Sequence, residues 1–249
     1  DFEGTLLNHR QNFKTVLAEF FEKLKPSNEG ERQLVEAMKY ATICEAAKYI
    51  RSFLALTCYK MLKGKITKEA MNIAMAVEFV HAYSLIHDDL PSMDNSDLRR
   101  GKPALHKKFK ESTALMAGSS LLTMAFEILE DIRIVKLLAS ASGAFGIMTG
   151  QVLDLDSKLK AENFEVMNYH KTGKLFEFCM VSGAIIAKCN KKKQEILAEY
   201  GRVLGVIFQM TDDILDEGEG GTSFLSIFSK EGLLLEIEKN VSMASARIV

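Results

Sequence analysis

Two short acidic clusters carry the residue types best suited to chemistry in this chain. The first contains Asp88, Asp89 and Asp94 and is followed at once by Arg99 and Arg100. Carboxylates this close together repel one another unless a cation holds them. Their oxygen atoms favour a hard ion such as Mg²⁺, which also bridges to phosphates. The adjacent arginines suit the anion that such a metal would touch, so the pattern predicts a diphosphate site.

The second cluster repeats this composition 124 positions later (212 − 88). On a helix, Asp212 and Asp216 share one face, and Asp213 lies about 100° round the axis. A solvated acidic surface is the alternative interpretation of either cluster. Both clusters, however, follow strongly apolar runs, where carboxylates are expensive to bury without partners. We therefore expect both clusters to hold ligands.

Such a site suits one kind of reaction. Metal ions and guanidinium groups would stabilise charge on a departing diphosphate, so that a carbon–oxygen bond can break. The cation left on carbon needs a dry cavity lined by apolar and aromatic side chains. Phe79 and Tyr83 precede Asp88 and could form that wall, although ordinary core aromatics would have the same sequence signature.

Helices must position these residues. The chain has three prolines in 249 residues, and its richness in Ala, Leu, Met, Glu and Lys predicts an all-α fold. Apolar residues recur at three- and four-residue steps over residues 13–24. Residues 70–89 are apolar almost all round, as in a central buried helix. A similar run leads from Ile196 into Asp212.

No domain boundary is evident, so we expect one domain over residues 1–249. Surface loops are expected at residues 156–161 and 217–221. Lys plus Arg (32) nearly balance Asp plus Glu (33), which argues against nucleic-acid and membrane partners. The four cysteines lack metal-ligand spacing and are expected to be reduced core thiols. No stretch reaches eighteen uninterrupted apolar residues and no signal-peptide pattern opens the chain, so we expect a soluble, cytoplasmic protein.

Four ordered motifs resemble those of the trans-isoprenyl diphosphate synthases, most closely the bacterial farnesyl diphosphate synthases (geranyltranstransferases). Residues 81–101 are similar to the first aspartate-rich motif in its bacterial form, with two extra residues between the aspartates. Residues 208–216 are similar to the second motif. Between them, residues 150–156 and 170–173 match in kind and order. The similarity runs from about residue 40 to residue 216.

The resemblance implies a single-domain antiparallel helical bundle around a central cavity, a polyprenyl synthetase domain that is usually dimeric. The implied reaction joins isopentenyl diphosphate to dimethylallyl or geranyl diphosphate by ionisation, condensation and proton loss. The implied product is farnesyl diphosphate, and the implied cofactor is Mg²⁺, about three ions. A homodimer acting on small diphosphates, with no other partner, is the expected assembly.

The resemblance also implies residue roles. The metal ligands would be Asp88 and Asp94 for two ions and Asp212 for a third, supported by Asp89, Asp213 and Asp216. The allylic diphosphate would be held by Arg99, Lys171, Thr172 and Gln209. Isopentenyl diphosphate would be held by Lys48, Arg51, His81 and Arg100. The implied catalytic residues are Asp88, Arg99, Lys171 and Asp212. The departing diphosphate would take the final proton, so no side chain is named as general base.

Tyr83 is the expected determinant of product length. It lies five residues before Asp88, about 7–8 Å along a helix, where an aromatic ring would stop elongation early. In the family, a bulky residue there together with the two-residue insertion is typical of a fifteen-carbon product.

The chain also departs from the family pattern. Ala46 and Ala47 precede Lys48 where the family usually has two glycines, and Ser52 replaces a common proline. The Gly-Lys loop and further lysine that normally follow Asp216 are not found.

Four other interpretations compete. A terpene cyclase would typically replace the second cluster with an Asn/Ser/Glu motif. A geranylgeranyl or longer-chain synthase would differ only in product. A non-catalytic partner subunit of a heteromeric synthase should have lost one or both clusters, although the missing lysine loop favours it. A purely structural helical protein has no need of Asp, Arg and Lys in this order.

Overall fold

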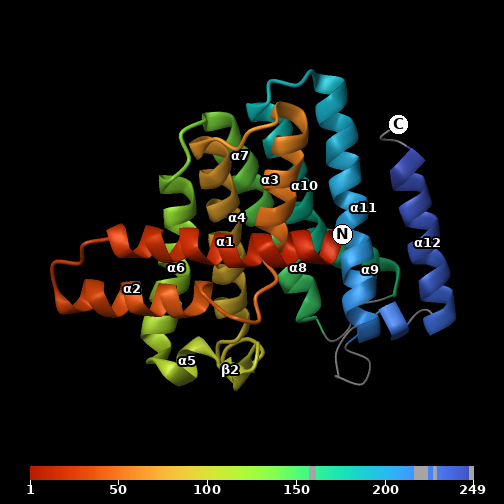
Figure 1. Cartoon of the computed structure of the whole chain (residues 1–249). Coiled ribbons are helices and arrows are strands. Elements are labelled where there is room, and N and C mark those ends of the chain that lie inside the picture. Colours follow the sequence, from red (N-terminus) through yellow and green to blue (C-terminus); the bar gives the residue numbers. More distant parts are fainter. Residues whose placement is uncertain (157–160, 216–223, 227–228, 247–249) are drawn as a thin grey trace. The chain divides into compact units, whose positions relative to one another are not determined.

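The computed structural model describes residues 1–156, 161–215, 224–226 and 229–246. Within these ranges the regular elements are helices apart from one short hairpin, so the all-α prediction is confirmed (Figure 1). The elements are α1 (Phe2–Lys23), α2 (Glu29–Thr42), α3 (Ile50–Lys63), α4 (Lys68–Asp88), β1 (Leu98–Arg99), β2 (Lys102–Pro103), α5 (Leu105–Lys108), α6 (Glu111–Glu127), α7 (Ile132–Ser142), α8 (Ile147–Asp154), α9 (Ala161–Asn168), η1 (Tyr169–Gly173), α10 (Lys174–Ile186), α11 (Lys191–Leu215), η2 (Phe224–Ser226) and α12 (Lys230–Ala246).

These elements gather into two compact units. The first contains residues 1–56 and 67–130, and the second contains residues 57–66 and 131–249. The chain passes from one unit to the other within α3, before returning at the start of α4.

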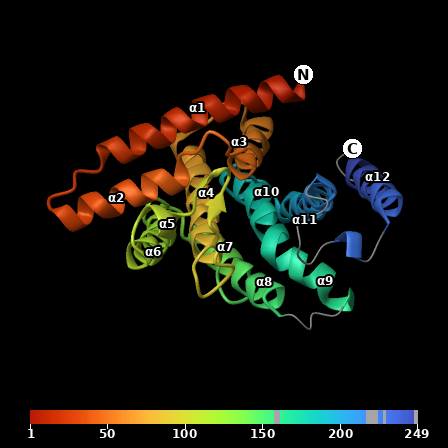
Figure 2. The same cartoon turned by 90° about the horizontal axis from the view of Figure 1, so that it is seen from below.

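In the first unit, the predicted apolar stripe of α1 is confirmed. Phe13, Leu17 and Phe21 are buried, and the helix ends at Lys23, shortly before Pro26. The Phe21 ring lies 5.9 Å from that of Phe79 in α4, which places the stripe against the core of this unit. Helices α1 and α2 lie side by side in both views (Figures 1 and 2).

Helix α4 is the central element of the first unit. Thr67 caps its first turn, its side chains are buried on every face, and it ends at Asp88. Helix α6 packs along it, and α2 contacts both (Figure 2). The prediction of a central buried helix over residues 70–89 is therefore confirmed, with Pro91 following its end as expected.

The second unit is built on the pair α10 and α11, against which η1 packs. Helix α10 is buried along most of its length. Helix α11 is not the all-round apolar helix that its sequence suggested, because only Gly201, Gly205 and Met210 are fully buried. Glu199 and Arg202 interrupt the apolar run, and Arg202 is exposed.

Residues 132–154 are long and apolar enough, by length and composition alone, to cross a membrane. The structure divides this stretch into α7 and α8, and 33% of its most apolar window is buried, so the feature is weak evidence for a membrane span. All four cysteines are free, and three of them are buried, as predicted. The expected loop at 217–221 and most of that at 156–161 lie outside the described residues.

Candidate active site

The end of α4 places the first acidic cluster at the edge of the core. Asp88 is 9% exposed and Asp89 is 2% exposed. The chain then turns back, because the Asp94 amide donates to the Asp88 carbonyl at 2.9 Å. This hydrogen bond returns the backbone of Asp94 to the end of α4, beside Asp88.

A tight hairpin presents the two arginines. Leu98 pairs with Pro103 and Arg99 with Lys102, while Arg100 and Gly101 form the turn. Both turn residues have positive φ, 53° and 73°, which is the backbone of a two-residue hairpin turn that matches strand twist. The hairpin therefore fixes the backbone positions from which the Arg99 and Arg100 side chains extend.

Arg99 lies among all three carboxylates of the first cluster. It donates to Asp89 through Nη2 at 2.5 Å and through Nε at 3.0 Å. Burial lowers the pKa of Arg99, but the Asp89 hydrogen bonds and the charges of Asp88 and Asp94 outweigh it and raise that pKa. The guanidinium is thus held charged and oriented at the cluster.

Three of the four residues assigned to isopentenyl diphosphate meet around α4. Arg100 Nη2 lies 3.2 Å from His81 Nε2, and an arginine can only donate, so this nitrogen of His81 is the acceptor. Burial, then the charges of Arg51, Arg100 and Arg99, lower the pKa of His81 well below its usual value. His81 is therefore neutral amid positive charge, which suits an anion-binding site.

Glu78 lies one helical turn before His81 and completes this polar cluster. It is 5% exposed and accepts the Ser52 amide at 2.9 Å. Burial raises its pKa, while the bonds from Ser52 and the charges of Arg51 and Arg100 oppose that rise. Glu78 ties the first turn of α3 to α4, and so it sets the position of Arg51. Lys48, the fourth predicted residue, is exposed on the loop before α3.

In the second unit, a chain of hydrogen bonds joins the remaining predicted residues. Thr172 Oγ1 donates to Gln209 Oε1 at 3.1 Å, and Gln209 Nε2 donates to Asp213 Oδ1 at 2.8 Å. The other oxygen of Asp213 accepts the Phe224 amide at 2.6 Å. Asp213 is thereby occupied within the protein, in line with a supporting role. Asp212 is half-buried beside it.

Lys171 is held by a short π-helical segment, η1. Its Nζ lies 2.5 Å from Asp154 Oδ2 at the end of α8. Gly150 makes this approach possible, since a Cβ there would lie 2.2 Å from the Lys171 amide nitrogen. Gly150, in the motif at residues 150–156, is therefore a point of backbone contact with the motif at residues 170–173.

Asp154 and Glu78 are the residues that sequence reasoning missed. Asp154 lay within a recognised motif, so its spacing could have singled it out. Glu78 resembles any helix glutamate in sequence, and only its burial marks it out.

The metal set is not assembled within either unit. Among the described residues, no three His, Cys, Asp or Glu side chains form a group able to hold a metal. Asp88 and Asp94 belong to the first unit, Asp212 belongs to the second, and Asp216 lies outside the described residues. The carboxylate oxygens of Asp88 and Asp94 are donors of the type that Mg²⁺ prefers.

Tyr83 is 7% exposed, with its ring edge-on to His87 at 4.7 Å between centroids. Burial and the nearby Asp88 charge raise the pKa of its hydroxyl. It is a neutral, fixed aromatic side chain a turn and a half before the acidic cluster.

The sequence also matches a known protein family. The profile of the Polyprenyl synthetase family matches residues 31–220. The chain belongs to this family. A farnesyl diphosphate synthase of Geobacillus stearothermophilus is 39% identical, over 86% of this chain and 75% of that protein. Geranylgeranyl pyrophosphate synthase 4 of Arabidopsis thaliana is 38% identical, over 87% of this chain and 60% of that protein.

Solved structures agree. An FPP/GFPP synthase from Zymomonas mobilis superposes with a TM-score of 0.88 at 34% identity, covering 98% of this chain and 92% of that one. A geranyltransferase from Legionella pneumophila gives a TM-score of 0.87 at 32% identity, covering 99% of this chain and 89% of that one. The polyprenyl synthetase is thus an all-α prenyltransferase of the trans-isoprenyl diphosphate synthase family.

Proposed function

We propose that this family member is a farnesyl diphosphate synthase, a geranyltranstransferase that condenses isopentenyl diphosphate with dimethylallyl or geranyl diphosphate. One observation carries the proposal. Arg99 is held at the end of the apolar helix α4 among three carboxylates, with the buried ring of Tyr83 a turn and a half behind them. The charges of the first acidic cluster therefore lie at the end of α4, with a buried aromatic ring one and a half turns behind them, as a reaction through an allylic cation needs.

As the resemblance implies, we assign the diphosphate of the allylic substrate to Arg99, Lys171, Thr172 and Gln209. Asp88 and Asp94 would hold Mg²⁺, with Asp212 as the ligand of a further ion. Magnesium held there would neutralise charge on the departing diphosphate. Arg99 and Lys171 add fixed positive charge, which lowers the energy of the same developing anion.

In the reaction, the allylic carbon–oxygen bond breaks and the diphosphate keeps the electron pair. The double bond of isopentenyl diphosphate then forms a bond to the allylic carbon, and one proton leaves to restore a double bond. The departing diphosphate takes that proton. Lys48, Arg51, His81 and Arg100 are assigned to orient isopentenyl diphosphate, and its own diphosphate is retained in the product.

Farnesyl diphosphate is the favoured product because Tyr83 is buried and held edge-on by His87, so its ring resists displacement by a longer chain. A geranylgeranyl diphosphate synthase is the second candidate, and the 38% identical geranylgeranyl pyrophosphate synthase 4 favours it. A non-catalytic partner subunit is less well supported, since Asp88 and Asp212 are both retained.

We also propose a single polyprenyl synthetase domain over residues 1–249, a homodimer and a cytoplasmic location. Leu115 and Met116 on α6 are 40% and 52% exposed, as apolar residues at a subunit contact would be in an isolated chain. Light scattering after size-exclusion chromatography would give the mass of the assembly.

The deciding experiment incubates the protein with isopentenyl diphosphate and either dimethylallyl or geranyl diphosphate, with Mg²⁺ or with excess EDTA. Prenyl alcohols are identified after dephosphorylation, and Asp88→Asn is the matched inactive control. Farnesol formed only with Mg²⁺ supports the proposal. A twenty-carbon alcohol supports the second candidate, and absence of condensation leaves the partner-subunit interpretation.

A further inference from the structure

The loop between α2 and α3, residues 43–49, carries Lys48 and has no glycine. We name residues 43–49 the Lys48 loop. Family members usually have two glycines before this lysine, whereas here Ala46 and Ala47 occupy those positions. Without glycine, a residue of this loop can adopt a left-handed backbone conformation only where other contacts hold it there.

Tyr49 supplies one such contact. Its φ is 50°, a conformation that an aromatic residue adopts only when its surroundings impose it. The side chain is 4% exposed, and its hydroxyl donates to the Thr42 carbonyl at 3.0 Å. The ring also lies 5.5 Å from that of Phe13 in α1. Tyr49 thus closes the base of the Lys48 loop against the end of α2.

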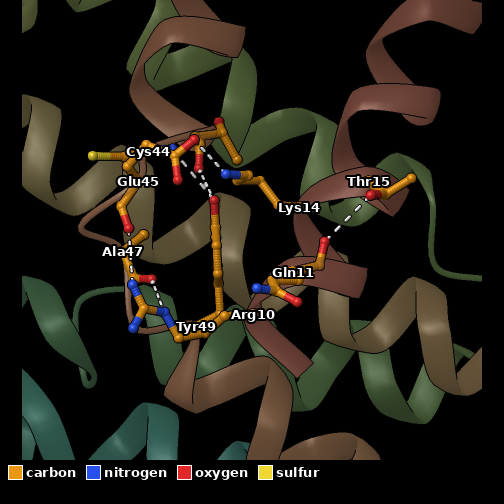
Figure 3. Close-up of polar contacts among 9 residues, drawn as sticks. Arg10, Gln11, Lys14, Thr15, Cys44, Glu45, Ala47 and Tyr49 are labelled. Carbon is orange, nitrogen blue, oxygen red and sulfur yellow. Dashed lines mark hydrogen bonds and ion pairs between the residues drawn. The ribbon is translucent and has the colours of Figure 1, made fainter. Parts of the chain in front are cut away.

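Arg10 of α1 supplies the second contact, at the centre of the loop. Its Nε donates to the Ala47 carbonyl at 3.1 Å, and its Nη2 donates to the Glu45 carbonyl at 2.8 Å (Figure 3). Lys14, one helical turn later, pairs with the Glu45 side chain. One planar guanidinium therefore spans two alternate carbonyls of the loop.

The Ala47 carbonyl belongs to the peptide group that ends in the Lys48 amide. Since a peptide group is planar, fixing this oxygen fixes the direction in which the chain enters Lys48. Ala47 is 1% exposed, so water cannot readily replace the arginine as donor. The orientation of Lys48 is thereby coupled to the side chain of Arg10.

We propose that Arg10 is a positioning residue for isopentenyl diphosphate binding, acting through the Lys48 loop. This inference rests on the proposed function, which assigns isopentenyl diphosphate to Lys48. Arg10 holds the loop by hydrogen bonds where relatives have glycine, and it touches no substrate itself.

The test compares Arg10→Met, which keeps length but removes the donors, with Arg10→Lys, which keeps the charge but loses the planar fork. Arg32→Met is the matched control, since Arg32 pairs with Glu29 on the exposed side of α2. In Arg10→Met, we expect KM for isopentenyl diphosphate to rise about tenfold, from loss of two charge-assisted hydrogen bonds. KM for geranyl diphosphate should change less than about twofold, and Arg10→Lys should be intermediate.

An equal rise in both KM values, or no rise in either, would overturn the inference. Backbone amide exchange provides a second measurement if Arg10→Met loses activity. Exchange should speed up across residues 43–49 while α4 stays protected, and unchanged exchange in the loop would also overturn the inference.

Failure of the proposed function can be distinguished from failure of this inference, because the wild-type protein would then form no prenyl product. In that case, calorimetric titration still tests the inference, because it measures the affinity for isopentenyl diphosphate without any reaction. Weaker binding to Arg10→Met than to the unvaried protein supports it. Equal binding, or no binding to either, rejects it.

Discussion

Arg99 and Asp89 form a two-pronged ion pair, with Nη2 2.5 Å and Nε 3.0 Å from the same carboxylate oxygen. Asp89 is almost wholly buried, whereas the Arg99 side chain is 38% exposed. The acid is therefore engaged inside the protein, whereas the arginine keeps part of its side chain accessible. This pairing divides the first cluster into a carboxylate that orients an arginine and two that are assigned to metal.

Replacing Asp89 by asparagine should release Arg99 from this orientation. We expect a loss of about 2 kcal/mol in the free energy of unfolding, because a charge-assisted pair is replaced by a weaker bond. KM for the allylic diphosphate should rise at the same time. Asp97→Asn is the control, since its ion pair with Lys107 is exposed and contributes little. Equal stability and kinetics in the two variants would contradict the orienting role.

Tyr83→Ala should lengthen the product by one or more five-carbon units, because it removes the ring behind the acidic cluster. Chromatography of the dephosphorylated products would measure the change. Tyr59→Ala is a matched truncation, since both tyrosines are 7% exposed. If Tyr83→Ala still yields only farnesol, Tyr83 does not limit elongation.

Gly150→Ala should destabilise the second unit and displace Lys171. The added Cβ would lie 2.2 Å from the Lys171 nitrogen and 2.5 Å from its Cα, and backbone cannot move aside as a side chain can. We expect a loss of about 1–3 kcal/mol in the free energy of unfolding, as for other overpacked sites. Gly30→Ala is the control, because its nearest neighbour would be a side-chain oxygen at 3.4 Å. Urea unfolding of both variants tests the contact, and equal midpoints would refute it.

Acidification should weaken the first unit through its partly buried histidines. Burial lowers the pKa of His9 to about 4, partly offset by a hydrogen bond that the His9 ring donates to the Tyr49 backbone. In the unfolded chain a histidine titrates near pH 6.5. Between these values the unfolded state binds the proton and the folded state does not, so the free energy of unfolding falls as pH falls. His81, whose pKa is also lowered, contributes with the same sign.

Urea unfolding at about pH 7.5 and about pH 5 should show this loss, on the order of 1 kcal/mol for each such histidine. His9→Gln should reduce the difference, since it removes one titrating group but keeps a partner for Ser52, whose hydroxyl lies 3.0 Å from His9. Glu78 acts in the opposite sense, because its raised pKa gives stability that is lost as pH rises. A pH response identical in His9→Gln would show that His9 is not the source.

The sequence was most predictive for features that lie within a single helix. The continuous apolar character of residues 70–89 was sufficient to predict a buried helix ending at Asp88, and the proline after it marked the end. The arginines after the cluster were expected to bind the anionic ligand, and the ion pair of Arg99 with Asp89 was not predicted.

It failed where the geometry depends on two distant segments. The π-helical segment η1 and the contact of Gly150 with Lys171 depend on packing between α8 and η1, which no local pattern encodes. The positive φ of Tyr49 is likewise imposed by Thr42 and Phe13 rather than by its own preference. The sparse burial of α11 was missed because an apolar run reads the same whether one face or all faces are covered.

Helix α4 carries both His81 and Asp88, so this one rigid rod fixes the distance between them. At 1.5 Å per residue the two positions are about 10 Å apart along its axis. Burial on every side leaves the rod no freedom to slide or rotate. Inserting a single residue between them would swing one end by about 100° relative to the other. Evolution can therefore exchange side chains along this rod, but it cannot easily change their number.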